Sequence, residues 1–127
     1  MTNADKVKIM MLRFNQEVKV KPAIPDSRIV ALRARIIQEE CTEVLDAIEE
    51  GDIKHIAKEL CDLLVVTYGA LHAYGICPDE AFELVHNSNM SKLGDDGKPE
   101  LRADGKVLKG SNYVEPDMEF IMWLSNM

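Results

Sequence analysis

Two long amphipathic segments, residues 27–50 and 52–74, carry carboxylates among their apolar side chains. A helix turns by about 100° per residue, so residues three or four apart share one face. In the first segment, Glu40 and Glu43 fall on the apolar face and Glu39 lies at its edge. That face is otherwise defined by Ile29, Leu32, Ile36, Val44 and Ala47. Because a buried carboxylate without a partner destabilises a fold, any structure of this chain must account for these acids.

The second segment shows the same conflict between burial and charge. Glu59 falls near the middle of its apolar face, and Asp62 lies on one flank. The apolar positions there are Ile56, Leu63, Val66, Ala70 and Ala73. If Gly51 marks the turn between antiparallel helices, Glu43 and Glu59 are each eight residues from it. Since Glu40 and Asp62 are each eleven residues away, we expect two facing pairs across an interaxial gap of about 8–10 Å.

Three arrangements would relieve the repulsion between these acids: protonation, pairing with basic side chains, or binding of a cation. The nearby basic residues on the same helix are Arg33 and Arg35, and Arg35 points away from the apolar face. A divalent cation is the simplest solution, and an all-oxygen ligand set suits Mg²⁺ first and Mn²⁺ second. The competing interpretation is a solvated charged face on a helix whose apolar side lies elsewhere.

Helix signals define the first half of the chain. Apolar spacing predicts a first helix over residues 4–18, which Pro22 interrupts. Asp26 or Ser27 is suited to cap a second helix, because a short polar side chain satisfies the free amides of the first turn. That helix is expected to end at Gly51, a residue type that readily adopts the left-handed conformation after a helix.

Similar signals define the second half. Asp52 is expected to cap a third helix that ends near Tyr74, and Pro78 to begin a fourth helix that reaches about Met90. Glycine- and aspartate-rich turns in the following residues predict loops or a small hairpin, followed by a last helical turn up to Trp123.

These elements predict an all-α fold, a four-helix-bundle protomer with an irregular C-terminal tail. We expect one domain over residues 1–127, with a helical core at about 4–92 and the tail at about 93–127. The 22 acidic side chains outnumber the 15 basic ones, and this net charge of −7 argues against nucleic acid or an anionic membrane as a partner. The chain lacks a long apolar segment, a signal-peptide core and a CxxC motif, so we expect a reducing, cytoplasmic location.

The acids form the pattern EExxE followed by ExxD, at residues 39–43 and 59–62. Further along the chain come SNMSK at residues 88–92 and DGKVLKG at residues 104–110, followed by Tyr113. Together these motifs resemble the all-α nucleoside triphosphate pyrophosphohydrolases, the superfamily of MazG, dimeric dUTPases and phosphoribosyl-ATP pyrophosphohydrolase. The likeness covers most of the chain and implies a helical protomer of the MazG-like type.

The resemblance implies a role for each acid. The family's metal ligands are matched by Glu40, Glu43, Glu59 and Asp62. Glu39 matches an additional acid used in metal binding or water activation, so Glu39 and Glu43 are the candidate catalytic residues. The implied reaction is Mg²⁺-dependent hydrolysis of a (deoxy)nucleoside triphosphate to the monophosphate and pyrophosphate, with Mn²⁺ as a possible substitute. Such an enzyme serves nucleotide-pool house-cleaning, and the identity of the nucleotide stays open.

The resemblance also implies substrate contacts and a partner. Asn89 and Lys92 match the family's polar pair that contacts the triphosphate. Lys109 and Tyr113 match the family's substrate contacts from the tail. The base pocket is built by the first helix and a neighbouring subunit, which points to Phe14 and Asn15; ordinary core and solvated surface are the competing roles for these two. Arg33 is suited either to a phosphate contact or to a surface salt bridge. We expect a homodimer or a dimer of dimers.

Two other functions compete with hydrolysis. A non-enzymatic helical interaction module would pair its acids with a basic partner. A di-iron carboxylate bundle would use ExxH motifs twice, and the chain has one, from Glu83 to His86. The other histidines, His55 and His72, lie near the inner face of the third helix, where a core or boundary role is expected.

Overall fold

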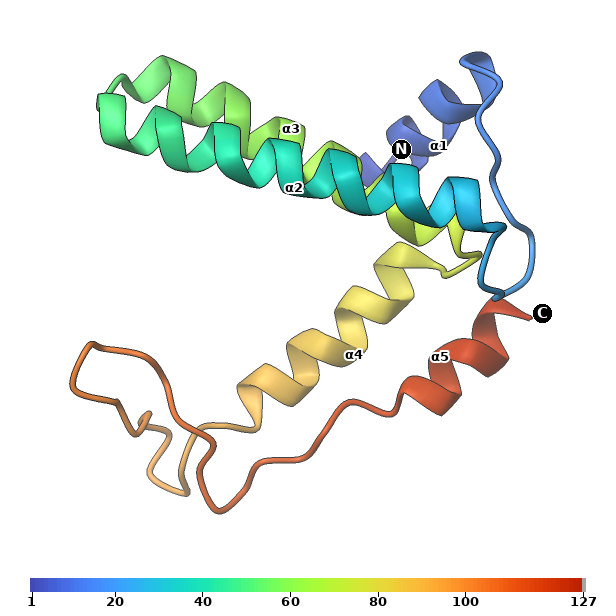
Figure 1. Cartoon of the computed structure of the whole chain (residues 1–127). Coiled ribbons are helices and arrows are strands. Elements are labelled where there is room, and N and C mark those ends of the chain that lie inside the picture. The colour runs from blue at the N-terminus through green and yellow to red at the C-terminus, as the bar shows by residue number, and fades with distance from the viewer. Residues whose placement is uncertain (127) are drawn as a thin grey trace.

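The computed structural model describes residues 1–126 and contains five α-helices in that range. They are α1 (Asn3–Arg13), α2 (Ser27–Glu50), α3 (Ile53–Ala73), α4 (Pro78–Met90) and α5 (Met118–Ser125) (Figure 1). Within the same residues, β structure is limited to an isolated bridge between Leu101 and Val107. The prediction of an all-α fold is therefore confirmed. Met127, the last residue of the predicted tail, lies outside the described residues.

The centre of the molecule is an antiparallel hairpin of α2 and α3, which lie side by side (Figure 1). Asp26 caps α2 by accepting hydrogen bonds from the backbone amides of Arg28 and Ile29 at 3.0 and 3.1 Å. The hairpin turns at Gly51, whose φ of 79° is left-handed, and Asp52 then caps α3. The predicted boundaries of both helices are confirmed. They could be predicted because each cap acts within a single turn.

Helix α1 packs against α3 and is shorter than predicted. It ends at Arg13, not at residue 18, because Asn15 adopts a left-handed φ of 58° that breaks the helical repeat. A buried side chain ties the two helices together, since His72 Nε2 lies 2.8 Å from the carbonyl oxygen of Ala4. His72 therefore has the core role expected for it.

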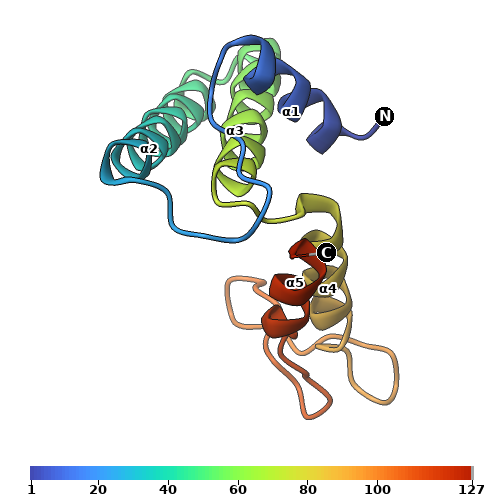
Figure 2. The same cartoon turned by 90° about the vertical axis from the view of Figure 1, so that its right-hand side faces the viewer.

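Helix α4 turns sharply away from the hairpin, with a bend of 110° between α3 and α4. Both views show α4 and α5 side by side and apart from most of α2 (Figures 1 and 2). Cys77 donates its backbone amide to Ser125 Oγ at 3.1 Å, which fixes the end of α5 beside the start of α4. Among the described residues no single helix is long and apolar enough to cross a membrane, although α3 and α4 together meet that test of length and composition.

The tail returns along α4 before it reaches α5. Ser88 Oγ donates a hydrogen bond to the Val114 carbonyl oxygen at 2.7 Å, which holds this part of the tail against α4. The predicted small hairpin is present around Gly105, with a hydrogen bond of 2.7 Å from the Arg102 amide to the Lys106 carbonyl. The last helical turn is also confirmed, and extends to two turns as α5.

Candidate active site

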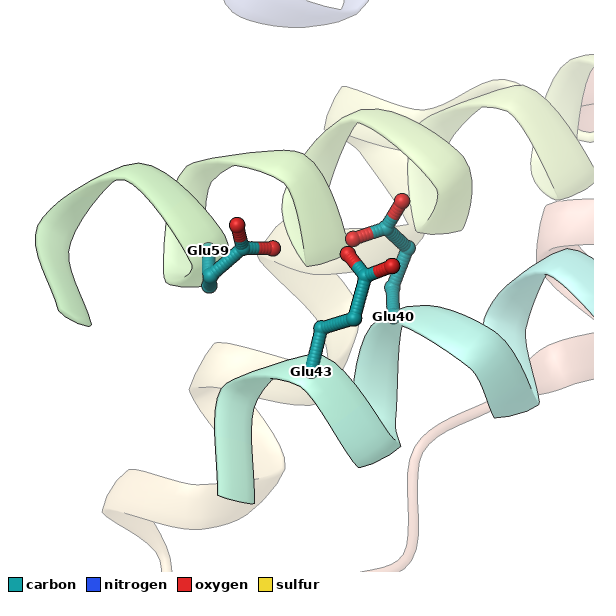
Figure 3. Close-up of side chains that lie close together, drawn as sticks. All are labelled: Glu40, Glu43 and Glu59. Atoms are coloured by element: carbon teal, nitrogen blue, oxygen red, sulfur yellow. The ribbon is translucent and has the colours of Figure 1, made fainter. Parts of the chain in front are cut away.

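Three carboxylates from α2 and α3 converge in the middle of the hairpin. One oxygen from each of Glu40, Glu43 and Glu59 lies within 4.8 Å of the others. Figure 3 shows Glu40 and Glu43 extending from α2 toward α3, with the Glu59 carboxylate directed toward them. Only 4% of Glu59 is exposed, whereas Glu40 is half-buried and Glu43 is exposed. We call these three residues the carboxylate trio.

The trio contains polar atoms with no partner in the described structure. Glu40 Oε2 and Glu59 Oε2 are both buried and accept no hydrogen bond within residues 1–126. A buried anionic oxygen without a partner is costly, and a hard divalent cation satisfies several such oxygens at once. The residues present therefore fit a Mg²⁺ or Mn²⁺ ion.

The trio also shifts the acidity of its members. The adjacent Glu59 carboxylate, to which a protonated Glu43 can donate, raises the pKa of Glu43 above its usual range, and the negative charge of Glu40 adds to this effect. Burial acts to raise the pKa of Glu59, but the hydrogen bond from Glu43 and the nearby Lys58 ammonium outweigh it and lower that pKa. A proton taken up by this pair in the absence of a cation therefore resides on Glu43 rather than on Glu59.

Asp62, the fourth predicted ligand, does not join the trio in this structure. Its Oδ2 atom lies 2.7 Å from Nζ of Lys58, which also lies 3.3 Å from Glu59 Oε1. His55 approaches from the same side, with Nε2 at 3.3 Å from Glu59 Oε1 and Nδ1 at 2.7 Å from Glu50 Oε2. The core or boundary role expected for His55 is wrong, because this residue is exposed and pairs with acids. Lys58 was not among the predicted site residues, although its spacing of four residues from Asp62 was a readable signal.

Glu39, the predicted water-activating acid, is exposed beside the trio. It lines a surface depression with Glu43, Arg35, Gln38 and Thr42. A ligand that enters this depression from solvent can therefore contact Glu39 and Glu43 together.

The predicted triphosphate contacts form a separate group at the far end of α4. Asn89 lies in the last turn of the helix, and Gly110 comes so close to the Lys92 carbonyl that an added Cβ would lie 3.0 Å from its oxygen. Lys109 Nζ lies 4.9 Å from the centre of the Tyr113 ring. Because α4 diverges from α2 and α3, a single chain does not bring these residues to the trio (Figures 1 and 2).

The candidate base-pocket residues lie where α1 ends. Phe14 is 64% exposed and Asn15 is also exposed, so Phe14 is not part of the core. The next residue, Gln16, contacts Arg33 of α2. Arg33 is buried, and therefore not the surface residue that a salt bridge on the outside of α2 would require.

A comparison with protein families decides the class of this protein. The model of the phosphoribosyl-ATP pyrophosphohydrolase family matches residues 7–89, which include all of the trio and Asp62. The chain belongs to this family. Since the match covers more than half of the chain, the protein is a pyrophosphohydrolase, an enzyme that hydrolyses a phosphoanhydride bond in a nucleotide-like substrate. No curated protein matches the chain.

Family membership also bears on the two competing functions. It favours a hydrolase over a non-enzymatic interaction module. In the described residues the one cluster of potential metal ligands is the trio, which contains no histidine. Glu83 and His86 are both exposed on α4, so the ExxH motif does not contribute to that cluster, as a di-iron bundle would require.

Proposed function

We propose that this member of the family hydrolyses a (deoxy)nucleoside triphosphate to the monophosphate and pyrophosphate in a Mg²⁺-dependent reaction. The observation that carries the proposal is the pair of buried, unpartnered oxygens of Glu40 and Glu59 in a cluster of three carboxylates. Removal of unwanted nucleotides from the cytoplasmic pool is the role that this chemistry suits. The three free cysteines, Cys41, Cys61 and Cys77, are compatible with a reducing compartment.

The trio is proposed to hold the ion through Glu40, Glu43 and Glu59. Asp62 would join them once its ion pair with Lys58 is broken. Asp62 follows Glu59 by three residues on α3, so the two side chains lie on nearly the same face of the helix. A bound divalent ion supplies positive charge for the triphosphate, which a protein of net charge −7 otherwise repels, and makes water more acidic.

Glu39 is proposed as the base that receives the proton of the attacking water. Its exposed carboxylate lies beside Glu43 in the same depression, so water and substrate can reach it together. Water attacks a phosphorus atom of the anhydride that links the α- and β-phosphates. The bond from that phosphorus to the bridging oxygen breaks, which releases the monophosphate and pyrophosphate. General-base assistance of this kind contributes about 10²–10⁴-fold to a rate.

A second copy of the chain is proposed to complete the site, as a homodimer or a dimer of dimers. Exposed apolar side chains on the hairpin support this assembly, since Leu45 is 66% and Ile48 is 52% exposed. The partner would bring polar and basic residues of its α4 and tail toward the triphosphate, because within one chain these elements lie apart from the trio. The residues meant are Asn89, Lys92, Lys109 and Tyr113, with Phe14 and Asn15 against the base.

The decisive experiment measures pyrophosphate release from a panel of canonical and modified nucleoside triphosphates, with Mg²⁺ and then Mn²⁺. We expect release of pyrophosphate with at least one substrate, and loss of release when a chelator is added. Release that is unaffected by chelation would overturn the metal-dependent mechanism. A chain that binds Mg²⁺ but releases pyrophosphate only from a substrate other than a simple triphosphate would overturn the substrate assignment alone.

A further inference from the structure

A second charged group lies buried in the hairpin, apart from the trio. Only 6% of Arg33 is exposed, and its side chain lies against the backbone of α3 at Gly69. A Cβ added to Gly69 would lie 2.6 Å from Arg33 Nη1 and 3.7 Å from Met11 Sδ. The guanidinium therefore occupies space that only a glycine at this position leaves open, between α1, α2 and α3.

No anion in the described part of the chain balances this cation. Arg33 Nε is buried without a hydrogen-bond partner, and Nη2 has only a long contact of 3.4 Å with the neutral oxygen Gln16 Oε1. The acid next to Gln16, Glu17, is paired with Lys19 at 2.9 Å. Burial lowers the pKa of Arg33, but an arginine in a protein stays ionised. A buried cation without a counter-ion is costly, so the site is suited to an anion from outside the chain.

The position of Arg33 relates this site to the trio. Arg33 precedes Glu40 by seven residues, which is about two helical turns, so both lie on nearly the same face of α2. At 1.5 Å per residue, their backbones are separated by about 10 Å along the helix axis. The cation thus lies at the α1 end of the helix pair, and the trio lies closer to Gly51.

We propose that Arg33, with Gln16 at its edge and Gly69 at its base, is a binding site for a phosphate oxyanion, separate from the phosphates that the trio engages. The oxyanion displaces the Gln16 amide from Nη2, because a charge-assisted hydrogen bond to a guanidinium is shorter and stronger than one to a neutral amide. The Gln16 side chain can move away from Arg33, since Gln16 lies on the exposed segment after α1. The oxyanion is either free phosphate or a phosphate group of a nucleotide, remote from the scissile bond.

The test measures thermal unfolding of the full chain with inorganic phosphate, in the presence of a chelator and at constant ionic strength. For the wild type we expect Tm to rise by about 4 °C at saturating phosphate, since a ligand of the native state stabilises it. Gln16→Glu places a carboxylate of the same shape beside Arg33. This variant is expected to have a higher Tm without phosphate and no further rise with it.

Asn87→Asp is the matched control, since it adds the same charge at an exposed position of α4 away from Arg33, and its response to phosphate should equal that of the wild type. Arg33→Met should lose the response, and if it does not fold, Gln16→Glu still decides. Absence of any response in the wild type, or a full response in Gln16→Glu, overturns the proposal. Adenosine monophosphate is tested in parallel: a larger rise than with phosphate identifies a nucleotide as the source, and an equal rise identifies free phosphate. Because a chelator is present, failure here leaves the metal-dependent reaction untouched.

Discussion

The ammonium of Lys58 lies 2.7 Å from the carboxylate of Asp62 and 3.3 Å from that of Glu59. A side chain of the protein itself thus provides the positive charge next to the carboxylate trio. These contacts raise the pKa of Lys58 above its usual range, so the lysine stays charged wherever the enzyme is folded. An incoming divalent ion must compete with this ammonium for the same oxygens.

The first prediction is that Lys58→Met binds Mg²⁺ more tightly than the wild type. An exposed ion pair between residues four apart is weak, so we expect only a small effect, roughly a twofold lower Kd by calorimetric titration. Lys54→Met is the matched control, because its exposed side chain lies on the same helix and forms no ion pair among residues 1–126. Equal affinity in Lys58→Met and the control would show that the lysine does not compete with the ion.

The second prediction concerns the trio itself. Glu43→Gln and Glu59→Gln should each lower kcat/KM for pyrophosphate release by at least about 100-fold, since even outer-sphere partners of a metal commonly cost 10–100-fold. Circular dichroism should show that the helices remain folded, because loss of a negative charge relieves the repulsion within the trio. Glu49→Gln, an exposed acid near the turn, serves as the control. Retained activity in both variants would refute the ligand assignment.

The third prediction is a pH dependence of metal binding. The pKa of Glu43 is raised above its ordinary value of 4.5, so at pH values just above 4.5 a proton still occupies the trio. A group whose pKa is raised on folding stabilises the metal-free protein at low pH, and this contribution is lost as the pH rises through the folded value. In chelator, Glu43→Gln should therefore lose less stability than the wild type as the pH rises from 4.5.

Mg²⁺ must displace the same proton, so the Kd of the wild type should fall as the pH rises through that range, until Glu43 is fully ionised. Titrations at several pH values measure this directly. A Kd that is constant from pH 4.5 to 8 would mean that no proton leaves the trio on binding.

The fourth prediction separates the two roles proposed for Glu39. If it accepts the proton from water, Glu39→Gln should lower kcat by about 10²–10⁴-fold and leave the Kd for Mg²⁺ nearly unchanged. If it is a metal ligand instead, Kd should rise with the loss of activity. Steady-state kinetics and calorimetry on the same preparation distinguish these outcomes, and Glu49→Gln again controls for the change of charge.

Local structure was largely predictable because its causes lie within a few residues. Asp26, Gly51 and Asp52 define the hairpin ends through side-chain caps and one left-handed residue. The end of α1 was not predictable from apolar spacing, since that spacing continues beyond Arg13 while the backbone turns at Asn15. A single residue outside the helical region outweighs a favourable pattern that follows it.

The candidate site was predictable in part for a related reason. The equal distances of Glu43 and Glu59 from the turn indicated that they face each other, and the structure brings them together with Glu40. The same argument paired Glu40 with Asp62, but Asp62 contacts Lys58 on its own helix instead. Competition between a neighbour on the same helix and a partner across the hairpin depends on side-chain conformations, which register alone does not specify.

The sequence by itself therefore determined the helices, the turn between α2 and α3, and the enrichment of acids along one side of that hairpin. Only the tertiary structure decided which of these acids converge, and that Arg33 is buried while Leu32 remains 42% exposed. The physical reason is the rotation of α2 about its own axis, which is set by its packing against α3, where Arg33 lies beside Gly69. A pattern along one helix specifies a face, whereas the neighbours of that face are chosen by the packing of the whole chain.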